Sequence, residues 1–384
     1  MIDMSNALAL DYEQELLVSN VGGIFSEDTR RLNNPAIQYS VPFITKSLIG
    51  NNITSYPKII RKILALFLIA FEPLFFLANT ILFVWVIRKI KPAIILSCNG
   101  GYPAAQACLA MALAGKVMKI PVVLSIVSMP ARRRFITWMY EKVIDWIVWK
   151  SVSVVVVNAQ SIASAICKVR GAPMAKIKVV YNGLEDKKIA PKKSQDDNRN
   201  CVIGCIARMD RDKGVLVLFE AFACLAKTHP EMQLVLAGHG NASAELENRT
   251  KILGLQNQVK LLGHYDGDVS PLLNTFDIYV FPSLWEGFPY SIVEALRSAC
   301  VIVATRVGGI PEAVTDGVEG LLIAPGTRDE IIRAIEKLVS DQDMSKMLAR
   351  NARARFEREF TLPKMYVRIR EIFAELKSEE VSWQ

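Results

Sequence analysis

Two glutamates stand close together where a strand is expected to end. Glu286 and Glu294, with seven residues between them, follow directly after the apolar run DIYVFPS. Gly287 and Pro289 mark a turn and the start of a helix, which puts Glu286 at the strand exit and Glu294 about one turn into that helix. The free backbone N–H groups of a helix start would suit a diphosphate. The alternative is that both acids are simply solvated.

Two cations flank a second turn of the same kind. Arg208 and Lys213 lie on either side of MDRD, immediately after the run CVIGCIA. Arg offers a bidentate fork and Lys a point charge, a pair that suits a leaving diphosphate without a metal. Positive charge is mildly unfavourable at a helix start, so this placement favours an anionic ligand over cations that merely cover the helix. Gly308-Gly309, after VIVATRV, would let backbone approach a ligand closely at a third strand exit.

The elements that must position these residues alternate along the chain. Short runs rich in Val and Ile alternate with helical stretches, which is typical of parallel βαβ units. The predicted strands of the first half are 15–19, 93–97, 121–125, 152–157 and 178–181, with helices at 103–118, 132–149 and 160–170. Those of the second half are 202–207, 233–237, 259–262, 278–281, 301–304 and 320–323, with helices starting near 213, 241, 287 and 327. Ligands bind at the carboxyl ends of such strands.

Length and composition predict two globular domains. The chain has 384 residues, 51% of them hydrophobic and 22% charged, which is more than one ordinary core accommodates. We predict an N-terminal domain over 1–186, a polar linker over 187–200, a C-terminal domain over 201–360, and a final helical tail over 361–384 that crosses back to the first domain. The seven cysteines form no C-x-x-C pair, so reduced thiols and no metal site are expected. The first fifteen residues lack a secretory pattern, which favours the cytoplasm.

The positive charge is concentrated in the first half. Residues 1–183 hold 20 Lys and Arg against 9 Asp and Glu, whereas the remainder holds 26 against 29. Since no nucleic-acid motif accompanies this charge, no nucleic-acid partner is expected, and an anionic membrane or phosphorylated lipid fits better. Exposed helices that merely carry solvated cations are the plainer interpretation.

The most apolar segment, residues 63–87, lies within a membrane-associating region predicted over 58–91. Its 25 residues could span a bilayer. Against spanning, it contains Glu72-Pro73 and Asn79, and it lies between strands that must pair in one sheet. We expect a helical pair broken near Pro73 that dips Phe75, Phe76 and Trp85 into the inner leaflet, while cations such as the run 132–134 meet anionic head groups. A helix buried in the first domain is the alternative.

Taken together, the motifs resemble family 4 of the glycosyltransferases, and within it the enzymes of bacterial polysaccharides and lipid-linked glycans. The segments A-R-M-D-R-D-K-G, A-G-H-G, L-G-H-Y, F-P-S-L-W-E-G-F-P-Y-S-I-V-E-A-L and G-G-I-P-E occur in the family's order and spacing over residues 200–325. The resemblance implies an α/β protein with the GT-B fold, in which two doubly wound Rossmann-like domains face a cleft. It also implies a nucleotide-sugar donor and no metal or redox cofactor.

The resemblance assigns roles to individual residues. Arg208 and Lys213 correspond to the pair that binds the diphosphate, and Glu294 to the carboxylate that accepts from the ribose hydroxyls. The segment 262–265 corresponds to the part that lies against the base, and 181–183 to the turn before the linker. The implied donor site consists of Arg208, Lys213, Glu286, Gly287, Phe288, Pro289, Glu294, His264, Gly22 and Gly23, with Glu286, Arg208 and Lys213 as its catalytic members.

Two departures concern the first domain and the start of the predicted strand at 301–304. Many relatives carry an active-site His in the first domain, where this chain has Val127 and Ser128, and its only histidines are His229, His239 and His264. Relatives also commonly have Gly and Pro where this chain has Ala299 and Val301. The missing His keeps a catalytically inactive nucleotide-sugar-binding homologue open as an alternative, and a nucleotide-sugar epimerase of the same fold is another.

The reaction implied by the resemblance is a retaining hexosyl transfer. The leaving diphosphate takes the proton from the acceptor hydroxyl on the same face of the sugar. The work of the protein is then electrostatic, because Arg208 and Lys213 stabilise charge that grows on the diphosphate. The acceptor is expected to be a hydroxyl of a lipid-linked or cell-surface glycan.

Overall fold

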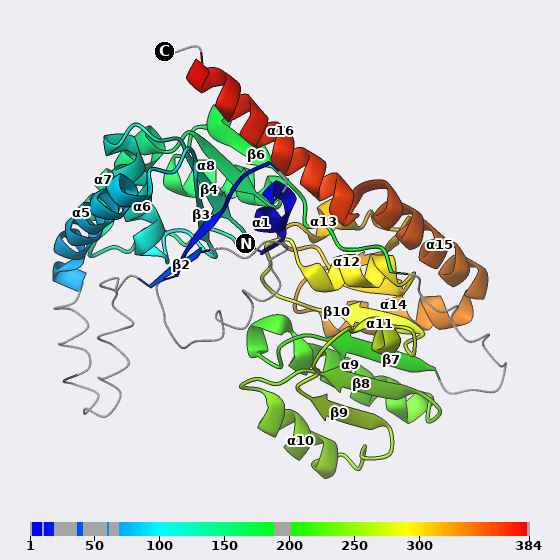
Figure 1. Ribbon diagram of the computed structural model, residues 1–384. Coiled ribbons are helices and arrows are strands. Elements are labelled where there is room, and N and C mark those ends of the chain that lie inside the picture. Colours follow the sequence, from blue (N-terminus) through cyan, green and yellow to red (C-terminus); the bar gives the residue numbers. More distant parts are fainter. Residues whose placement is uncertain are drawn as a thin grey trace. The chain divides into compact units, whose positions relative to one another are not determined.

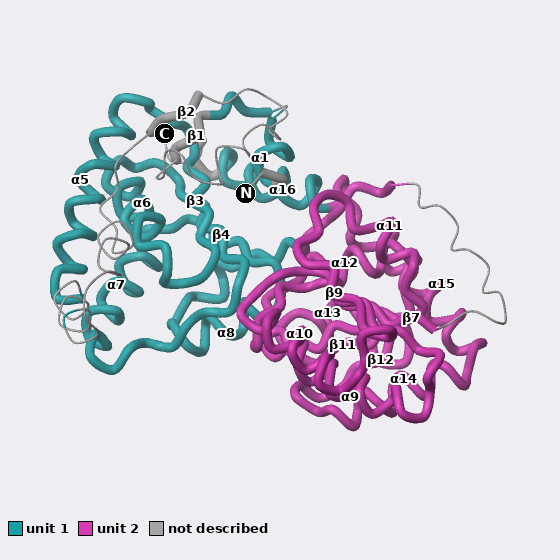
Figure 2. Tube along the Cα trace, turned by 90° about the horizontal axis from the view of Figure 1, so that it is seen from below, with its two compact units in different colours: residues 1–180, 365–384 teal, residues 181–364 magenta. Residues whose placement is uncertain are grey.

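The computed structural model describes residues 2–9, 11–18, 37–40, 60, 69–187 and 201–381. The chain divides into two compact units, which Figure 2 colours separately: unit 1 comprises 1–180 with 365–384, and unit 2 comprises 181–364. The predicted glycine loop Gly22-Gly23, residues 188–200 of the predicted linker, and residues 63–68 of the apolar segment lie outside the described residues.

Unit 1 contains a four-stranded parallel sheet in the order β3-β4-β5-β6. Its elements are α1 (Ile2–Leu8), β1 (Glu15–Val18), β2 (Ile37–Ser40), α5 (Glu72–Ile90), β3 (Ile95–Asn99), α6 (Gln106–Val117), β4 (Val122–Ile126), α7 (Trp138–Ser151), β5 (Val154–Val157), α8 (Gln160–Arg170), a 3₁₀ turn (Met174–Lys176) and β6 (Ile177–Val179). Every residue of β4 is buried, as expected for a parallel strand that is covered on both faces. The predicted strands of this half all form.

One strand pair of unit 1 was not predicted in full. The predicted strand at 15–19 forms as β1, but it pairs in parallel with β2 in a separate two-stranded sheet. Sequence reasoning missed β2 because its four residues, IQYS, are too short and too polar to give a strand pattern.

The described part of the apolar segment folds mainly as one helix, α5. It begins at Glu72 with Pro73 in its first turn, so the predicted break near Pro73 coincides with a helix start. Among the described residues α5 is also the one helix long and apolar enough to cross a membrane, with a mean hydropathy of 1.6, and a third of its most apolar window is buried. The expectation for Phe76 was wrong: this side chain is 6% exposed, on a helix that packs against α6.

Unit 2 contains a six-stranded parallel sheet in the order β12-β11-β10-β7-β8-β9 (Figure 1). Its elements are β7 (Val202–Ile206), a 3₁₀ turn (Arg211–Lys213), α9 (Val215–Thr228), β8 (Gln233–Ala237), α10 (Ser243–Ile252), β9 (Val259–Gly263), α11 (Ser270–Leu273), β10 (Ile278–Phe281), α12 (Tyr290–Arg297), β11 (Val301–Thr305), α13 (Ile310–Ala313), β12 (Gly320–Ile323), α14 (Arg328–Ser340) and α15 (Gln342–Glu359). All strands predicted for this half form, and β10 and β11 are buried throughout.

Helices cover both faces of this sheet. Helix α9 packs against α14, and α12 packs against α15. The buried side chains of α9 and α14 form one hydrophobic core with those of β7, β8, β10 and β11. This doubly wound arrangement leaves the carboxyl ends of the strands for the connecting loops, where the predicted site residues lie.

The final helical region is interrupted near residue 360, where the predicted helical tail 361–384 begins. Helix α15 ends at Glu359 and α16 (Leu362–Val381) begins after it. Pro363 explains the break, because proline has no N–H and its ring clashes with the preceding turn of a continuous helix. The chain between the helices pairs with Leu184, whose N–H donates to the Phe360 carbonyl (2.9 Å) and whose carbonyl accepts from the Leu362 N–H (2.8 Å).

Beyond Met365, helix α16 is part of unit 1. Arg370 donates to the Ala7 carbonyl of α1 (2.9 Å) and pairs with Asp11 (3.0 Å). Phe373 meets the ring of Tyr12 edge to face, and Ile369 is 1% exposed. The last residues of the chain therefore complete the core of the unit that holds its first residues.

This packing predicts the stability of two neighbouring variants. Ile369→Ala should lower the free energy of unfolding of unit 1 by about 2–5 kcal/mol, because it leaves a cavity in a close-packed core. Val367→Ala, at a position that is 54% exposed on the same helix, should change it by less than about 0.5 kcal/mol. Hydrogen exchange of peptides from β3 to β6 under mild denaturant measures the effect on unit 1 alone. Equal protection in the two variants would contradict this packing.

Candidate active site

The site residues of unit 2 lie where the strand order changes direction. From β7 the chain adds β8 and β9 on one side, and then adds β10, β11 and β12 on the other. The loops that leave β7 and β10 therefore diverge, and this point is where doubly wound sheets bind ligands. The segment from Arg208 to Lys213 follows β7, and Glu286 follows β10.

An ion pair joins these two loops. Lys213 Nζ lies 2.7 Å from Glu286 Oε1, and the two side chains are only 16% and 11% exposed. A salt bridge so far removed from water is held more firmly than one on the surface, and loss of one partner leaves the other as an uncompensated charge. The structure thus brings together Lys213, the predicted diphosphate cation, and Glu286, the predicted catalytic carboxylate of the donor site.

Two glycines set the spacing of the loops. Gly214 has φ +67°, and a Cβ there would lie 2.0 Å from the Pro282 carbonyl oxygen. Gly308 has φ +53°, and a Cβ there would lie 2.1 Å from the Glu286 carbonyl oxygen. The close backbone approach expected at Gly308-Gly309 is therefore made to the loop of Glu286. The Gly309 N–H donates to the Gly287 carbonyl at 2.6 Å, which holds that loop in place.

Arg208 lies at the entrance of the same loop and is 67% exposed. Its guanidinium is 2.6 Å from Asp210 and 4.0 Å from Asp212. Sequence reasoning gave these acids no role, although their alternation with the cations in RMDRDK was the available signal. The Asp212 carbonyl also accepts from the Leu284 N–H at 2.8 Å. The β7 loop is thereby fastened to the β10 loop through backbone as well as through charge.

Glu294 lies on α12, half buried, about one turn after the helix start as predicted. Burial raises the pKa of its carboxyl; nearby Arg297 opposes this and Asp268 adds to it. Arg297, which sequence reasoning missed, is 4% exposed and donates to Ser270 Oγ (2.6 Å) and to the Glu185 carbonyl (3.1 Å). Its position one turn after Glu294 on the helix was the signal that could have identified it.

The segment Gly287–Pro289 contributes backbone rather than side chains. Phe288 is 3% exposed and packs against the rings of Tyr181 (5.0 Å) and Phe360 (5.5 Å). Asn182 donates to the Phe288 carbonyl at 2.8 Å. The turn at Tyr181-Asn182 therefore supports the loop that carries Glu286. Pro289 forms the N-cap of α12.

The histidines occupy exposed loops. His264 Nε2 lies 2.9 Å from Asp266 Oδ1, and its side chain is 75% exposed. His239 is exposed, and its carbonyl accepts from the Met209 N–H at 3.2 Å. Among the described residues no group of three or more His, Cys, Asp and Glu is placed to hold a metal ion.

The structure describes the residues at two of the departures from the family pattern. Val127, just after β4, is 43% exposed, and the Ser128 hydroxyl donates to the Gly100 carbonyl after β3. These residues occupy the position in unit 1 where relatives carry a histidine. Ala299 has φ +49°, a left-handed conformation that favours glycine, and this fits the glycine that the family resemblance implies there.

The chain matches two family descriptions one after the other. Residues 33–188 match "Glycosyltransferase Family 4" and residues 186–355 match "Glycosyl transferases group 1". The chain belongs to glycosyltransferase family 4, and its two parallel sheets make up the GT-B fold.

Particular relatives agree with this assignment. A glycosyltransferase from Rickettsia africae superposes with a TM-score of 0.75 at 19% identity, over 97% of this chain and 93% of its own. HepE of Anabaena, solved in complex with UDP, superposes with a TM-score of 0.67 at 25% identity, over 77% and 82%. An Escherichia coli UDP-Gal:alpha-D-GlcNAc-diphosphoundecaprenol alpha-1,3-galactosyltransferase is 25% identical over 52% of this chain and 54% of its own. The matched region spans about half the length of the curated relatives.

The raised pKa of Glu294 predicts that Glu294→Gln is more stable than the wild type near neutral pH. A carboxyl whose pKa is higher in the folded state contributes stability that is present below its unfolded pKa and lost as pH rises. The gain should therefore be largest at pH 7 and shrink as the pH falls to about 4. Urea unfolding at both pH values measures it, with the exposed Glu247→Gln as the control.

The same variant should bind free nucleoside diphosphate more weakly, because it loses the carboxylate expected to accept from the ribose. Titration calorimetry with UDP measures this loss. A variant that is both less stable and unchanged in affinity would contradict the assignment of Glu294.

Proposed function

We propose that this protein is a retaining, metal-independent hexosyltransferase that moves a sugar from a nucleotide diphosphate donor to a hydroxyl of a lipid-linked or cell-surface glycan. The observation that carries the proposal is the partly buried pair of Lys213 and Glu286 at the switch point of unit 2. A cation and a carboxylate held 2.7 Å apart there are the two groups that a sugar diphosphate needs, one for each end of the bond that breaks.

When the donor binds, Lys213 and Glu286 each leave the other for a new partner on the donor. A diphosphate that binds beside Lys213 offers a doubly charged anion in place of one carboxylate, and the helix start of α12 adds N–H donors. Glu286 is then released to accept hydrogen bonds from the hydroxyls of the donor sugar. Arg208, exposed and held by Asp210, supplies a second cation that can turn to the diphosphate.

The transfer itself is balanced within the two substrates. The bond between the anomeric carbon and the diphosphate oxygen breaks, and the acceptor oxygen forms its bond on the same face of the sugar. The acceptor proton passes to the departing diphosphate. Lys213 and Arg208 stabilise the negative charge that develops on that group, and this is the largest contribution the protein makes.

The donor is proposed to be a UDP-hexose. HepE was solved with UDP, and the E. coli relative is named for UDP-galactose as donor and a diphosphoundecaprenol-linked sugar as acceptor. A lipid-linked acceptor agrees with the concentration of positive charge in residues 1–183. We place the protein in the cytoplasm, bound peripherally to the inner face of the membrane, with unit 1 binding the acceptor.

Donor binding and turnover by the full chain test this function. UDP-, GDP- and ADP-hexoses are titrated, and each is then incubated with and without membrane lipid extract. Transfer of labelled sugar from a UDP-hexose into lipid, with retention at the anomeric carbon, is the expected result. Conversion of the donor without acceptor would identify an epimerase instead, and binding without turnover under all conditions would identify an inactive homologue.

Removal of either cation, Arg208 or Lys213, should lower turnover while the protein stays folded. Arg208→Ala and Lys213→Ala should each lower turnover by about 10²-fold or more, because both act on charge that develops during transfer. Arg211→Ala is the matched control: it lies in the same turn, but its guanidinium pairs with Glu245 of α10, and its turnover should stay near that of the wild type.

Glu286→Gln gives a contrasting result. It should lower turnover, yet leave the affinity for UDP unchanged or higher, because Lys213 no longer has a competing carboxylate. Loss of UDP affinity in Glu286→Gln, or wild-type turnover in Lys213→Ala, would contradict the exchange of partners.

Chelation should leave the rate unaltered. If the two cations and the helix start neutralise the diphosphate, the initial rate in excess EDTA should equal that in Mg²⁺ within experimental error. A rate that collapses in EDTA and returns with added Mg²⁺ or Mn²⁺ would overturn the metal-independent mechanism.

A further inference from the structure

Helix α5 turns its polar residues inward, beside the buried apolar residues Phe76, Phe83, Val86 and Ile87, and carries further large apolar residues outward. Its buried face includes Glu72 (0% exposed), Asn79 (1%) and Thr80 (5%). Its outer face, at helical spacing, carries the large apolar residues Leu74, Leu77, Ile81 and Trp85, which are 53–63% exposed. A helix in contact with water normally shows the opposite arrangement.

Helix α7 is arranged in the same way, with Ile144, Val148 and Trp149 buried beside its acids. Glu141 and Asp145 are 5% and 2% exposed, whereas Trp138, Met139, Val143 and Trp146 are 44–65% exposed. Phe135 and Ile136, just before the helix, are 97% and 73% exposed. Exposed apolar residues scattered singly need no explanation. This set, however, is gathered on two helices, α5 and α7, and on the loop 135–137 directly before α7.

The inward acids are held by arginines. Arg134 contacts both oxygens of Glu72 (3.1 and 2.7 Å) and pairs with Glu141 (2.6 Å). Arg170 also pairs with Glu141 (2.8 Å), and Arg133 with Asp145 (2.7 Å). The head-group role expected for the whole run 132–134 is therefore wrong for Arg133 and Arg134, which neutralise buried carboxylates. This network fixes α5 to α7 and keeps their apolar faces on the outside.

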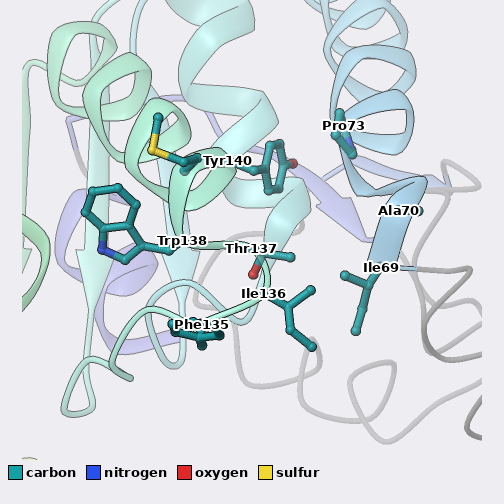
Figure 3. A pocket seen from close by; sticks show the side chains of 9 residues that line it. Ile69, Ala70, Pro73, Phe135, Ile136, Thr137, Trp138 and Tyr140 are labelled. Carbon is teal, nitrogen blue, oxygen red and sulfur yellow. The ribbon is translucent and has the colours of Figure 1, made fainter.

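A groove of about 740 Å³ lies between the chain at the start of α5 and the chain at the start of α7 (Figure 3). Ile69, Ala70 and Pro73 line one side, and residues 135–140 line the other. The side chains of Ile69 and Ile136 face the space between the segments. Its lining is mainly apolar, which suits a hydrocarbon chain.

The charge around this surface is of one sign. Residues 69–151 contain ten Lys and Arg but only three acids, Glu72, Glu141 and Asp145, and all three are buried. Lys89 Nζ lies 5.8 Å from the ring centre of Trp85, and Lys142 Nζ lies 5.1 Å from that of Trp138. Exposed tryptophans flanked by lysines are the arrangement found at membrane interfaces.

We propose that the outer faces of α5 and α7, with the loop at 135–137, form one surface that docks on an anionic lipid bilayer. Trp85, Ile81, Trp138 and Trp146 enter the boundary between head groups and acyl chains, and the groove receives a lipid chain. The exposed lysines and arginines meet the anionic head groups. The surface deepens the proposed function, since it would bring unit 1 to a lipid-linked acceptor, but it does not depend on catalysis.

Helix α5 lies on the membrane rather than across it. Its inner face packs on α6, and its C-terminus leads within a few residues into β3 of the parallel sheet. A spanning α5 would take Glu72 from Arg134 and leave a buried charge in hydrocarbon, which costs several kcal/mol. The bilayer therefore replaces water only on the outer face.

Flotation with lipid vesicles tests the surface directly. The full chain is mixed with vesicles of three parts phosphatidylcholine to one part phosphatidylglycerol, and with vesicles of phosphatidylcholine alone. We expect binding mainly to the anionic vesicles, weakened but not abolished by high salt. The pairs Ile81→Ser/Trp85→Ser and Trp138→Ser/Trp146→Ser should each weaken binding by at least about tenfold.

The control removes exposed apolar residues elsewhere. Ile252 and Leu253, at the end of α10 in unit 2, are 72% and 54% exposed, and Ile252→Ser/Leu253→Ser should bind vesicles as the wild type does. Circular dichroism establishes that each variant is folded. Lys89→Glu/Lys142→Glu should lower binding to anionic vesicles while leaving the weak binding to neutral ones unaltered.

Three outcomes would overturn the surface. Wild-type protein that stays with the soluble fraction is one, and serine variants that bind as well as the wild type are another. The third is a dimer that forms without lipid and dissociates in the serine variants, which would make this face a contact between copies of the chain. A chain that floats with vesicles but transfers no sugar contradicts the proposed function and leaves the surface standing, whereas an active chain that binds no vesicles contradicts the surface alone.

Discussion

The pairing of Lys213 with Glu286 depends on the topology of the parallel sheet in unit 2. Connections in such a sheet leave from the carboxyl ends of the strands, and only at the change of direction do two loops diverge enough to admit a ligand. Here those loops follow β7 and β10, and their charged residues meet 2.7 Å apart. Gly214 and Gly308 permit this approach because each places backbone where a Cβ would collide. The helix start, the glycines and the ion pair are thus consequences of one topology.

Unit 1 makes a different use of charge. Its buried acids are not placed for chemistry but are satisfied by Arg133, Arg134 and Arg170. Buried ion pairs of this kind add little net stability, because the cost of removing both charges from water offsets their attraction. Their effect is geometric: they orient α5 and α7 and keep large apolar side chains exposed. An orientation that water alone would disfavour is what motivates the proposed membrane surface.

Function and stability oppose each other at Glu294. Burial raises the pKa of this carboxyl, so that the ionised form is held at a cost in the free enzyme. A ligand that donates hydrogen bonds to it relieves this cost. Binding sites generally carry groups whose environment is unfavourable until the ligand arrives, and the charge of nearby Arg297, which donates to Ser270, offsets part of the rise in this pKa.

The sequence by itself determined every described strand except β2 and the order of the two main sheets, and it predicted the donor-site residues. Runs such as VVVV at 154–157 and VIVAT at 301–305 can be stable only as strands buried on both faces, and the charged residues that follow them must then lie at one edge of a sheet. Sequence could not determine which charges meet. Whether Lys213 faces Glu286 or a solvent ion, and whether Arg134 faces Glu72, 62 residues away, or a lipid, is decided by contacts between segments that local patterns do not encode. The same limit applies to α5: its composition is apolar all round, so only its packing against α6 decides that Phe76 is buried and Trp85 is exposed. Periodicity measures the preference of one segment for burial, whereas the choice of face and of partner is a property of the whole tertiary structure.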